Sequence, residues 1–300
     1  MCLIVAYVAI FSQIVEFTDR ALLASDTWSY QSIAVNFAKG HGFHRSGKIE
    51  PIDEYKFSDN YNPRYFNIFN TYTGIVDVHR NLGYPLFLSS IYRVFGISPI
   101  IAKYIQLLLL IIIASLLPWL GYVIWNNIGF LSGLIASPLF LIQNFRISEQ
   151  IMSESLVIFT LFLMVTSCIY CELRKTRKSA IILGLTFGIG LLVKGNLLFI
   201  PLLYFLYYLI RCNQDKESLG LKNFFIIVGF FLLPIIPWIL FVNIQNNLIK
   251  DKLKQVKAVI LSDDILIIEK SVIIDGIYPQ VGRGFLSKRE LTFEEKRMLS

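Results

Sequence analysis

The sequence predicts an all-α, polytopic membrane protein of about seven transmembrane helices, with a large extracytoplasmic first loop that carries two surface helices. Two observations lead to this fold class. Of the 300 residues, 55% are hydrophobic and only 16% are charged, and the mean hydropathy is +0.60, which is far from the balance of soluble proteins. Apolar runs long enough to cross a bilayer also recur along the chain. We expect spans at about residues 1–17, 101–123, 128–144, 151–171, 179–194, 197–210 and 223–243.

The segment after the first apolar run reads ASDTWSYQSIAVNFAKGHGF, residues 24–43. Its apolar side chains recur at helical spacing and form one stripe, made of Tyr30, Ile33, Ala34 and Phe37. Ser25 or Asp26 can cap the start of this helix, and Gly40 can end it. Because a helix with one apolar stripe lies along a membrane and does not cross it, we expect a surface helix over about 27–39.

The rest of the first loop is too long to be a simple connector, so we expect it to have a function. Its middle part is rich in aromatic residues, which suit either interfacial anchoring or stacking on sugars. A Gly-Tyr-Pro turn at Gly83 then leads into a second amphipathic stretch, which predicts another surface helix over about 84–95.

The orientation of the chain follows from basic residues in short loops. The turn RKTRKSA between the fourth and fifth spans and the loop RCNQDKESLGLK two spans later both belong in the cytoplasm. Residues 18–100 and 245–300 are therefore expected on the extracytoplasmic side, and 1–244 forms the transmembrane domain. The chain stops just as a capping-box helix begins at Thr292, so we expect it to be truncated or unusually short.

Five motifs carry a family resemblance. Residues 26–43 read D-x-x-x-Y…A…G-x-G-F, and residues 80–96 read R-N-L-G-Y-P-L-F-L-x-x-I-Y-x-x-F-G. SESL (153–156), GIGLLVKGNLLFIPL (188–202) and PWILFVN (237–243) follow in order. Together they resemble the polyprenyl-phosphate-sugar-dependent glycosyltransferases of the GT-C type, closest to the protein mannosyltransferase and aminoarabinose transferase branch. The usual R-P-P-G-Y-P and the proline after the basic residue are altered here, at Asn81, Leu82 and Gly195.

The resemblance implies an inverting hexosyl or pentosyl transfer to a hydroxyl of a protein, lipid A or a cell-envelope glycan, at the outer face of the cell membrane. It makes Asp26 the catalytic base, and Lys194 and Arg80 ligands of the donor phosphate. Glu154, Tyr30 and Tyr84 would support them. We expect no cofactor and no metal ion, since the first loop has no D-x-D, and we expect no nucleic-acid partner.

Each of these residues also has a structural interpretation. Asp26 can serve as a helix cap, and Lys194 can be a lysine that reaches from a span to the interface. Arg80 can be an interfacial anchor, and Glu154 can pair with Lys194 or Arg80 or orient substrate.

The alternative function is a transporter or flippase of lipid-linked sugars, which glycine and proline interruptions of the spans would suit. The titratable residues gather at one rim and no internal repeat is present, which favours the enzyme over the transporter. A third possibility is an inactive glycan-binding relative, which would retain the folded first loop and lose the catalytic base. The presence of Asp26 argues against it.

Overall fold

The computed structural model describes residues 2–14, 25–46, 72–76, 80–212 and 221–260. The predictions for residues 47–71 and 261–300 lie outside these ranges. The helices are α1 (Cys2–Ile14), α2 (Ser25–Ala38), α4 (Gly83–Phe95), α5 (Pro99–Asn144), α6 (Glu154–Arg174), α7 (Arg177–Val193), α8 (Phe199–Cys212) and α9 (Leu221–Ile260). Short 3₁₀ turns, η3 (Phe145–Glu149) and η4 (Gly195–Leu198), precede α6 and α8.

The predicted helical fold is confirmed for the described residues, with one addition. A small antiparallel sheet joins β1 (His44–Ser46) to β2 (Tyr72–Val76), with His44 opposite Val76 and Arg45 opposite Ile75. The first loop therefore contains this short sheet in addition to the two helices. A three-residue strand is too short to produce the alternating pattern that identifies strands in a sequence.

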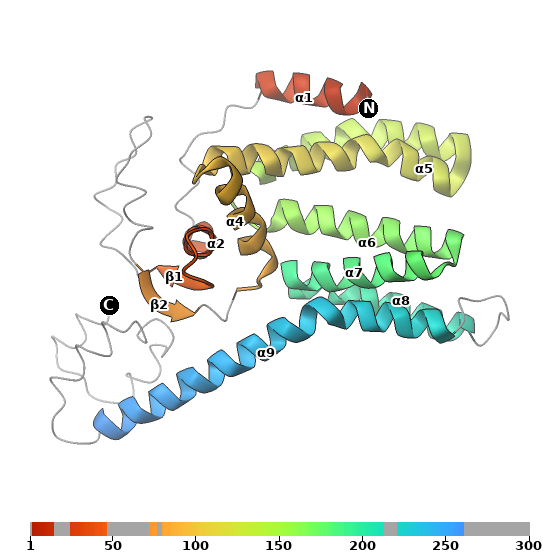
Figure 1. Ribbon diagram of the computed structural model, residues 1–300. Helices are drawn as coiled ribbons and strands as arrows, with labels where there is room; N and C mark the ends of the chain where they lie inside the picture. Colours follow the sequence, from red (N-terminus) through yellow and green to blue (C-terminus); the bar gives the residue numbers. More distant parts are fainter. Residues whose placement is uncertain (1, 15–24, 47–71, 77–79, 213–220, 261–300) are drawn as a thin grey trace.

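The helices form a bundle with a separate group of elements at one end. Figure 1 shows α5, α6, α7 and α8 running roughly side by side, with α2, α4, β1 and β2 gathered at one end of them. The turn between α6 and α7, which carries the basic residues of RKTRKSA, lies at the opposite end. This separation agrees with the predicted topology, while the side of the membrane that each end faces stays a prediction.

Glycines determine how closely α7 and α9 approach. A Cβ atom on Gly184 would lie 2.5 Å from the carbonyl oxygen of Ile227, and one on Gly188 would lie 2.4 Å from Cγ of Pro234. These two glycines are four residues apart and so share one face of α7. Small residues at this spacing allow the close helix packing typical of membrane bundles. Past this contact, α9 continues through residue 244, where we predicted the transmembrane domain to end.

α5 is two helices folded back on each other. Its backbone leaves helical geometry at Trp125 and at Asn126, whose φ is +52°; asparagine accepts a positive φ more readily than most residues. Ser137 Oγ donates to the carbonyl oxygen of Ala114 at 2.6 Å, although the two residues are 23 positions apart. A Cβ on Gly121 would lie 2.1 Å from the carbonyl oxygen of Gly129, so the two halves touch backbone to backbone.

Three helical stretches of the described residues are long and apolar enough to cross a membrane: Pro99–Glu149, Glu154–Arg174 and Lys222–Gln245. The first is bent double within α5, so it covers two predicted spans. A shorter apolar stretch, Gly195–Arg211, and the helices α1 and α7 occupy the remaining predicted segments. These findings support a membrane protein, and the full set of seven crossings stays a prediction.

α2 has nearly the predicted bounds, but its surroundings are different. We expected one buried apolar stripe and a solvated polar face. Polar residues all around the helix are instead at most 1% exposed: Thr27, Ser29, Gln31, Ser32 and Asn36. α2 packs against α4 and β1, and packing from more than one side buries residues that helical periodicity alone assigns to water. The expectation of a single buried stripe is therefore wrong.

Candidate active site

Glu154 and Lys194, two of the residues selected from the sequence, form an ion pair. Lys194 Nζ donates to Glu154 Oε1 at 3.2 Å, and each side chain is 38% exposed. The pairing that the sequence analysis considered for Glu154 is thereby confirmed. The expected span over 151–171 places Glu154 one turn inside the membrane, but Glu154 is the first residue of α6. At that position its carboxylate lies at the positive end of the helix dipole.

Lys194 stands where the helical backbone breaks between α7 and α8. Its φ and ψ are −154° and 125°, which is extended backbone, and its N–H donates to the carbonyl oxygen of Gly190 at 3.0 Å. The 3₁₀ turn η4 begins at the next residue. The break directs the lysine side chain across the end of the bundle to the start of α6, where Glu154 lies.

The glycine of the Gly-Tyr-Pro motif brings α4 against this same break. We expected the motif to form a turn before the helix. Gly83 is instead the first residue of α4, so the motif forms the start of the helix itself. A Cβ at Gly83 would lie 2.7 Å from the backbone nitrogen of Val193 and 2.8 Å from the carbonyl group of Leu192. Only a residue without a side chain permits this approach. The contact therefore sets the position of Tyr84, the next residue, relative to Lys194.

We expect Gly83→Ala to lower the free energy of unfolding by about 1–3 kcal/mol, because backbone atoms must move to admit the methyl group. The matched control is Gly229→Ala in α9, where a Cβ would meet nothing within 4 Å and should be tolerated. Denaturant titration in detergent micelles measures both. Equal stability of the two variants would contradict the close contact.

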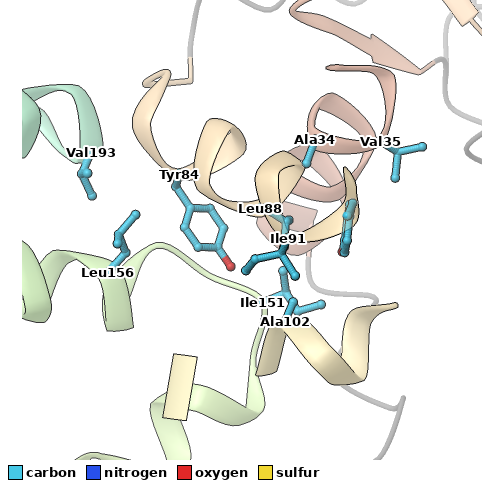
Figure 2. Packing of buried hydrophobic residues seen from close by; sticks show 10 residues of the cluster. Ala34, Val35, Tyr84, Leu88, Ile91, Ala102, Ile151, Leu156 and Val193 are labelled. Carbon is cyan, nitrogen blue, oxygen red and sulfur yellow. The ribbon is translucent and has the colours of Figure 1, made fainter. Parts of the chain in front are cut away.

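Tyr84 extends from α4 into the core between α5, α6 and the end of α7. Figure 2 shows its ring near Leu156, with Val193 on the α7 side and Leu88 and Ile91 on α4 itself. The ring is 1% exposed. Burial, the nearby Tyr92 and Tyr30 hydroxyls and the charge of Glu154 raise the pKa of Tyr84 well above its ordinary value. Tyr84 is therefore neutral and a hydrogen-bond donor at physiological pH.

Gln106 receives that hydrogen bond. Tyr84 Oη donates to Gln106 Oε1 at 2.9 Å, and Gln106 Nε2 donates to the carbonyl oxygen of Gln150 at 3.0 Å. Gln106 has no exposed surface. The chain of bonds links α4, α5 and the segment that precedes α6, and so it fixes the tyrosine hydroxyl.

We expect Gln106→Leu to cost about 1–3 kcal/mol of folding stability, because it leaves the buried Tyr84 hydroxyl without its partner. The Gln150 carbonyl oxygen still accepts from the N–H of Met152 at 3.0 Å. Adding Tyr84→Phe to this variant should restore part of the loss, since the orphaned hydroxyl is then removed. Denaturant titration of both single variants and the double variant gives the coupling. Additive losses would show that the two side chains do not interact.

Arg80 and Tyr30 extend the group toward α2. The guanidinium carbon of Arg80 lies 5.0 Å from the centre of the Tyr30 ring, and Tyr30 meets Tyr84 edge to face at 4.9 Å. The structure thus brings Arg80, Tyr30 and Tyr84 into one contiguous group, and the charge of Glu154 acts on Tyr84. Lys194 is attached to the group through Glu154.

Asp26 is the second residue of α2, one helical turn before Tyr30. Its side chain lies outside the described part of the structure, so its role stays a prediction. Sequence reasoning missed Gln106 and also Lys103, which is 1% exposed. These two polar residues lie three apart at the start of an otherwise apolar span. This anomaly is a signal that would have identified both.

An apolar cavity on α9 is a different feature. It has a volume of about 410 Å³, is lined almost entirely by apolar atoms, and lies along Lys222, Phe225 and Phe230. α9 begins at the end of the bundle away from α2 and α4. Because this cavity contains none of the charged residues of the group around Tyr84, we do not assign chemistry to it.

Comparison with known families identifies a related family. A sequence model of the family described as dolichyl-phosphate-mannose-protein mannosyltransferase matches residues 98–250, which is about half of the chain. This range contains Gln106, Glu154 and Lys194, whereas Asp26 and Arg80 precede it. Searches of curated proteins and of solved structures gave no match. The resemblance seen in the sequence motifs is confirmed: this chain belongs to the dolichyl-phosphate-mannose-protein mannosyltransferase family.

Proposed function

We propose that this chain is a membrane glycosyltransferase that moves a sugar from a polyprenyl-phosphate donor to an acceptor hydroxyl. The family match over residues 98–250 carries the proposal, because the family name describes transfer of mannose from dolichyl phosphate to protein. The polar group at the end of the bundle supports it. Cationic, carboxylate and phenol side chains meet there at the ends of apolar helices, where a donor with a lipid tail and a polar head can bind.

The proposed reaction is a displacement at the anomeric carbon with inversion. The acceptor oxygen forms a bond to that carbon while the bond to the phosphate oxygen breaks, and its electron pair leaves with the phosphate. Asp26 takes the acceptor's proton, and Lys194 and Arg80 stabilise the negative charge on the departing phosphate. Glu154 holds Lys194 in place through the 3.2 Å contact. Tyr30 packs against Arg80 and maintains its position, and Tyr84 supports Tyr30 from the other side through their edge-to-face contact.

We further propose that the reaction takes place at the extracytoplasmic face. The group around Tyr84 and the basic turn between α6 and α7 lie at opposite ends of the bundle, and basic short turns belong in the cytoplasm. A protein hydroxyl is the acceptor that the family name indicates. Lipid A and cell-envelope glycans remain alternative acceptors, and a hexose other than mannose or a pentose is an alternative sugar.

The test is transfer by the purified full chain in proteoliposomes that contain polyprenyl-phosphate [¹⁴C]mannose. We expect label to leave the lipid and to appear on an added Ser/Thr-rich peptide, with release of polyprenyl phosphate. The same assay with donors that carry glucose or an aminopentose tests the alternative sugars. The assay with lipid A in place of the peptide tests an alternative acceptor. If intact labelled lipid only moves between leaflets, the protein is a flippase and the proposal is wrong.

A further inference from the structure

Four buried side-chain atoms near Tyr84 have no hydrogen-bond partner among the described residues. They are Thr27 Oγ1 and Gln31 Nε2 on α2, and Glu154 Oε2 and Ser155 Oγ at the start of α6. Buried polar atoms in native proteins are nearly always paired, because an unpaired one loses its hydration without compensation. Such a concentration at one place needs a physical explanation, and a polar ligand supplies one.

The two α2 residues lie on the face of that helix that packs toward Tyr84. Thr27, Tyr30, Gln31 and Ala34 are spaced at i, i+3, i+4 and i+7, which places them on one side of a helix. Tyr30 meets the ring of Tyr84 at 4.9 Å, and Ala34 belongs to the same packed cluster as Tyr84 and Leu156. Figure 2 shows Ala34 on α2 opposite α4. Thr27 and Gln31 therefore border the candidate active site, one and five residues after Asp26.

We propose that Thr27 and Gln31 bind hydroxyl groups of the transferred sugar and so contribute to its selection. Their chemistry fits a neutral hydroxylated ligand: the threonine hydroxyl can donate and accept, and the amide nitrogen of Gln31 donates. Neither can balance a phosphate charge, which Lys194 and Arg80 are placed to do. The two polar functions are thus divided between α2 for the sugar and the ends of α4 and α7 for the phosphate. This inference rests on the proposed function.

A purely structural role for Thr27 and Gln31 predicts normal sugar transfer when they are replaced by apolar residues. Thr27 is fully buried and Gln31 is 1% exposed, so replacing an unpaired polar group there by an apolar group of similar shape should leave stability unchanged or increase it. If the polar groups serve only the fold, Thr27→Val and Gln31→Leu would fold well and transfer sugar normally. If they bind the sugar, the same variants fold well and lose transfer.

The experiment uses the full chain in proteoliposomes with polyprenyl-phosphate mannose as donor. We expect Thr27→Val and Gln31→Leu each to lower kcat/KM roughly tenfold, the size of one lost hydrogen bond, with no drop in Tm. Ser32→Ala is the matched control. Ser32 is also fully buried on α2, but its hydroxyl is satisfied by the carbonyl oxygen of Ser29 at 3.1 Å, so this change should leave transfer unchanged.

Donors that carry 2-, 3-, 4- or 6-deoxymannose identify the hydroxyl concerned. On the one analogue that lacks the hydroxyl bound by Thr27, the kcat/KM of Thr27→Val should equal that of wild type. On the other analogues its kcat/KM should stay roughly tenfold lower. If wild type transfers mannose and both apolar variants transfer it equally well, this inference is wrong and the proposed function stands. If wild type neither transfers from polyprenyl-phosphate mannose nor gains thermal stability from it, both proposals fail for that sugar. A loss of activity in Ser32→Ala as large as in Thr27→Val would also overturn the inference.

Discussion

Asp26→Asn is expected to reduce sugar transfer at least about a hundredfold, while the protein still folds and binds its donor. Asparagine is nearly isosteric and caps helix N-termini about as well as aspartate, so the start of α2 should persist. It cannot take the acceptor's proton, and loss of a general base costs about 10²–10⁴ in rate. The phosphate is held by cations in this proposal, and donor affinity should therefore survive.

The measurement is single-turnover release of sugar from labelled polyprenyl-phosphate mannose, because a single turnover separates the chemical step from binding and product release. Donor affinity is measured in parallel by the shift in thermal unfolding, and expression level and Tm report folding. If the variant transfers sugar within a few fold of wild type, Asp26 only stabilises the first turn of α2 and the base lies elsewhere.

Lys194→Met is expected to weaken donor binding by roughly 10- to 100-fold, the range for a lost hydrogen bond to a charged group. The ion pair that it breaks is 38% exposed on each side, so the accompanying loss of stability should stay below about 1 kcal/mol. Affinity and stability therefore respond differently. Titration of polyprenyl-phosphate mannose against thermal unfolding gives both quantities from one experiment.

Two controls separate a phosphate ligand from a structural lysine. Arg211→Met breaks a comparable pair, in which Arg211 donates to Glu172 Oε2 at 2.8 Å with side-chain exposures of 36% and 25%. Those residues lie near the far ends of α6 and α8, so donor affinity should not change. The charge exchange Glu154→Lys with Lys194→Glu restores an ion pair but moves the cation to α6. Wild-type donor affinity in the exchanged protein would show that Lys194 serves only to pair with Glu154.

The sequence predicted helices wherever a periodic apolar pattern was long. α4 begins within one residue of its expected start, and α6 begins and ends three residues after the expected span 151–171, because apolar residues at helical spacing must turn toward a core. The cost of an unpartnered charge near a span predicted a partner for Glu154, with Lys194 and Arg80 as candidates, and the structure pairs it with Lys194. These inferences needed only local pattern and charge.

What the sequence did not predict depends on contacts between distant segments. Gln31 and its polar neighbours on α2 are buried because α4 and β1 pack against the helix. The spacing of apolar residues within one helix does not show which other elements contact it. Gln106 is recognisable only once Tyr84 and the Gln150 carbonyl stand beside it. From the sequence, Gly83 is interpreted as a turn residue. Its role in the close contact with the backbone of α7 is visible only in the structure.

The doubled form of α5 has a consequence for the biosynthesis of the protein. At Gly121 and Gly129 each half presents bare backbone to the other, and Ser137 of one half bonds to Ala114 of the other. A half that entered lipid alone would expose its serine hydroxyl and its glycine backbone to hydrocarbon, which is unfavourable. We therefore expect the two halves to leave the translocon together as a preformed hairpin, so that the ribosome must synthesise residue 144 before residue 99 settles in the bilayer.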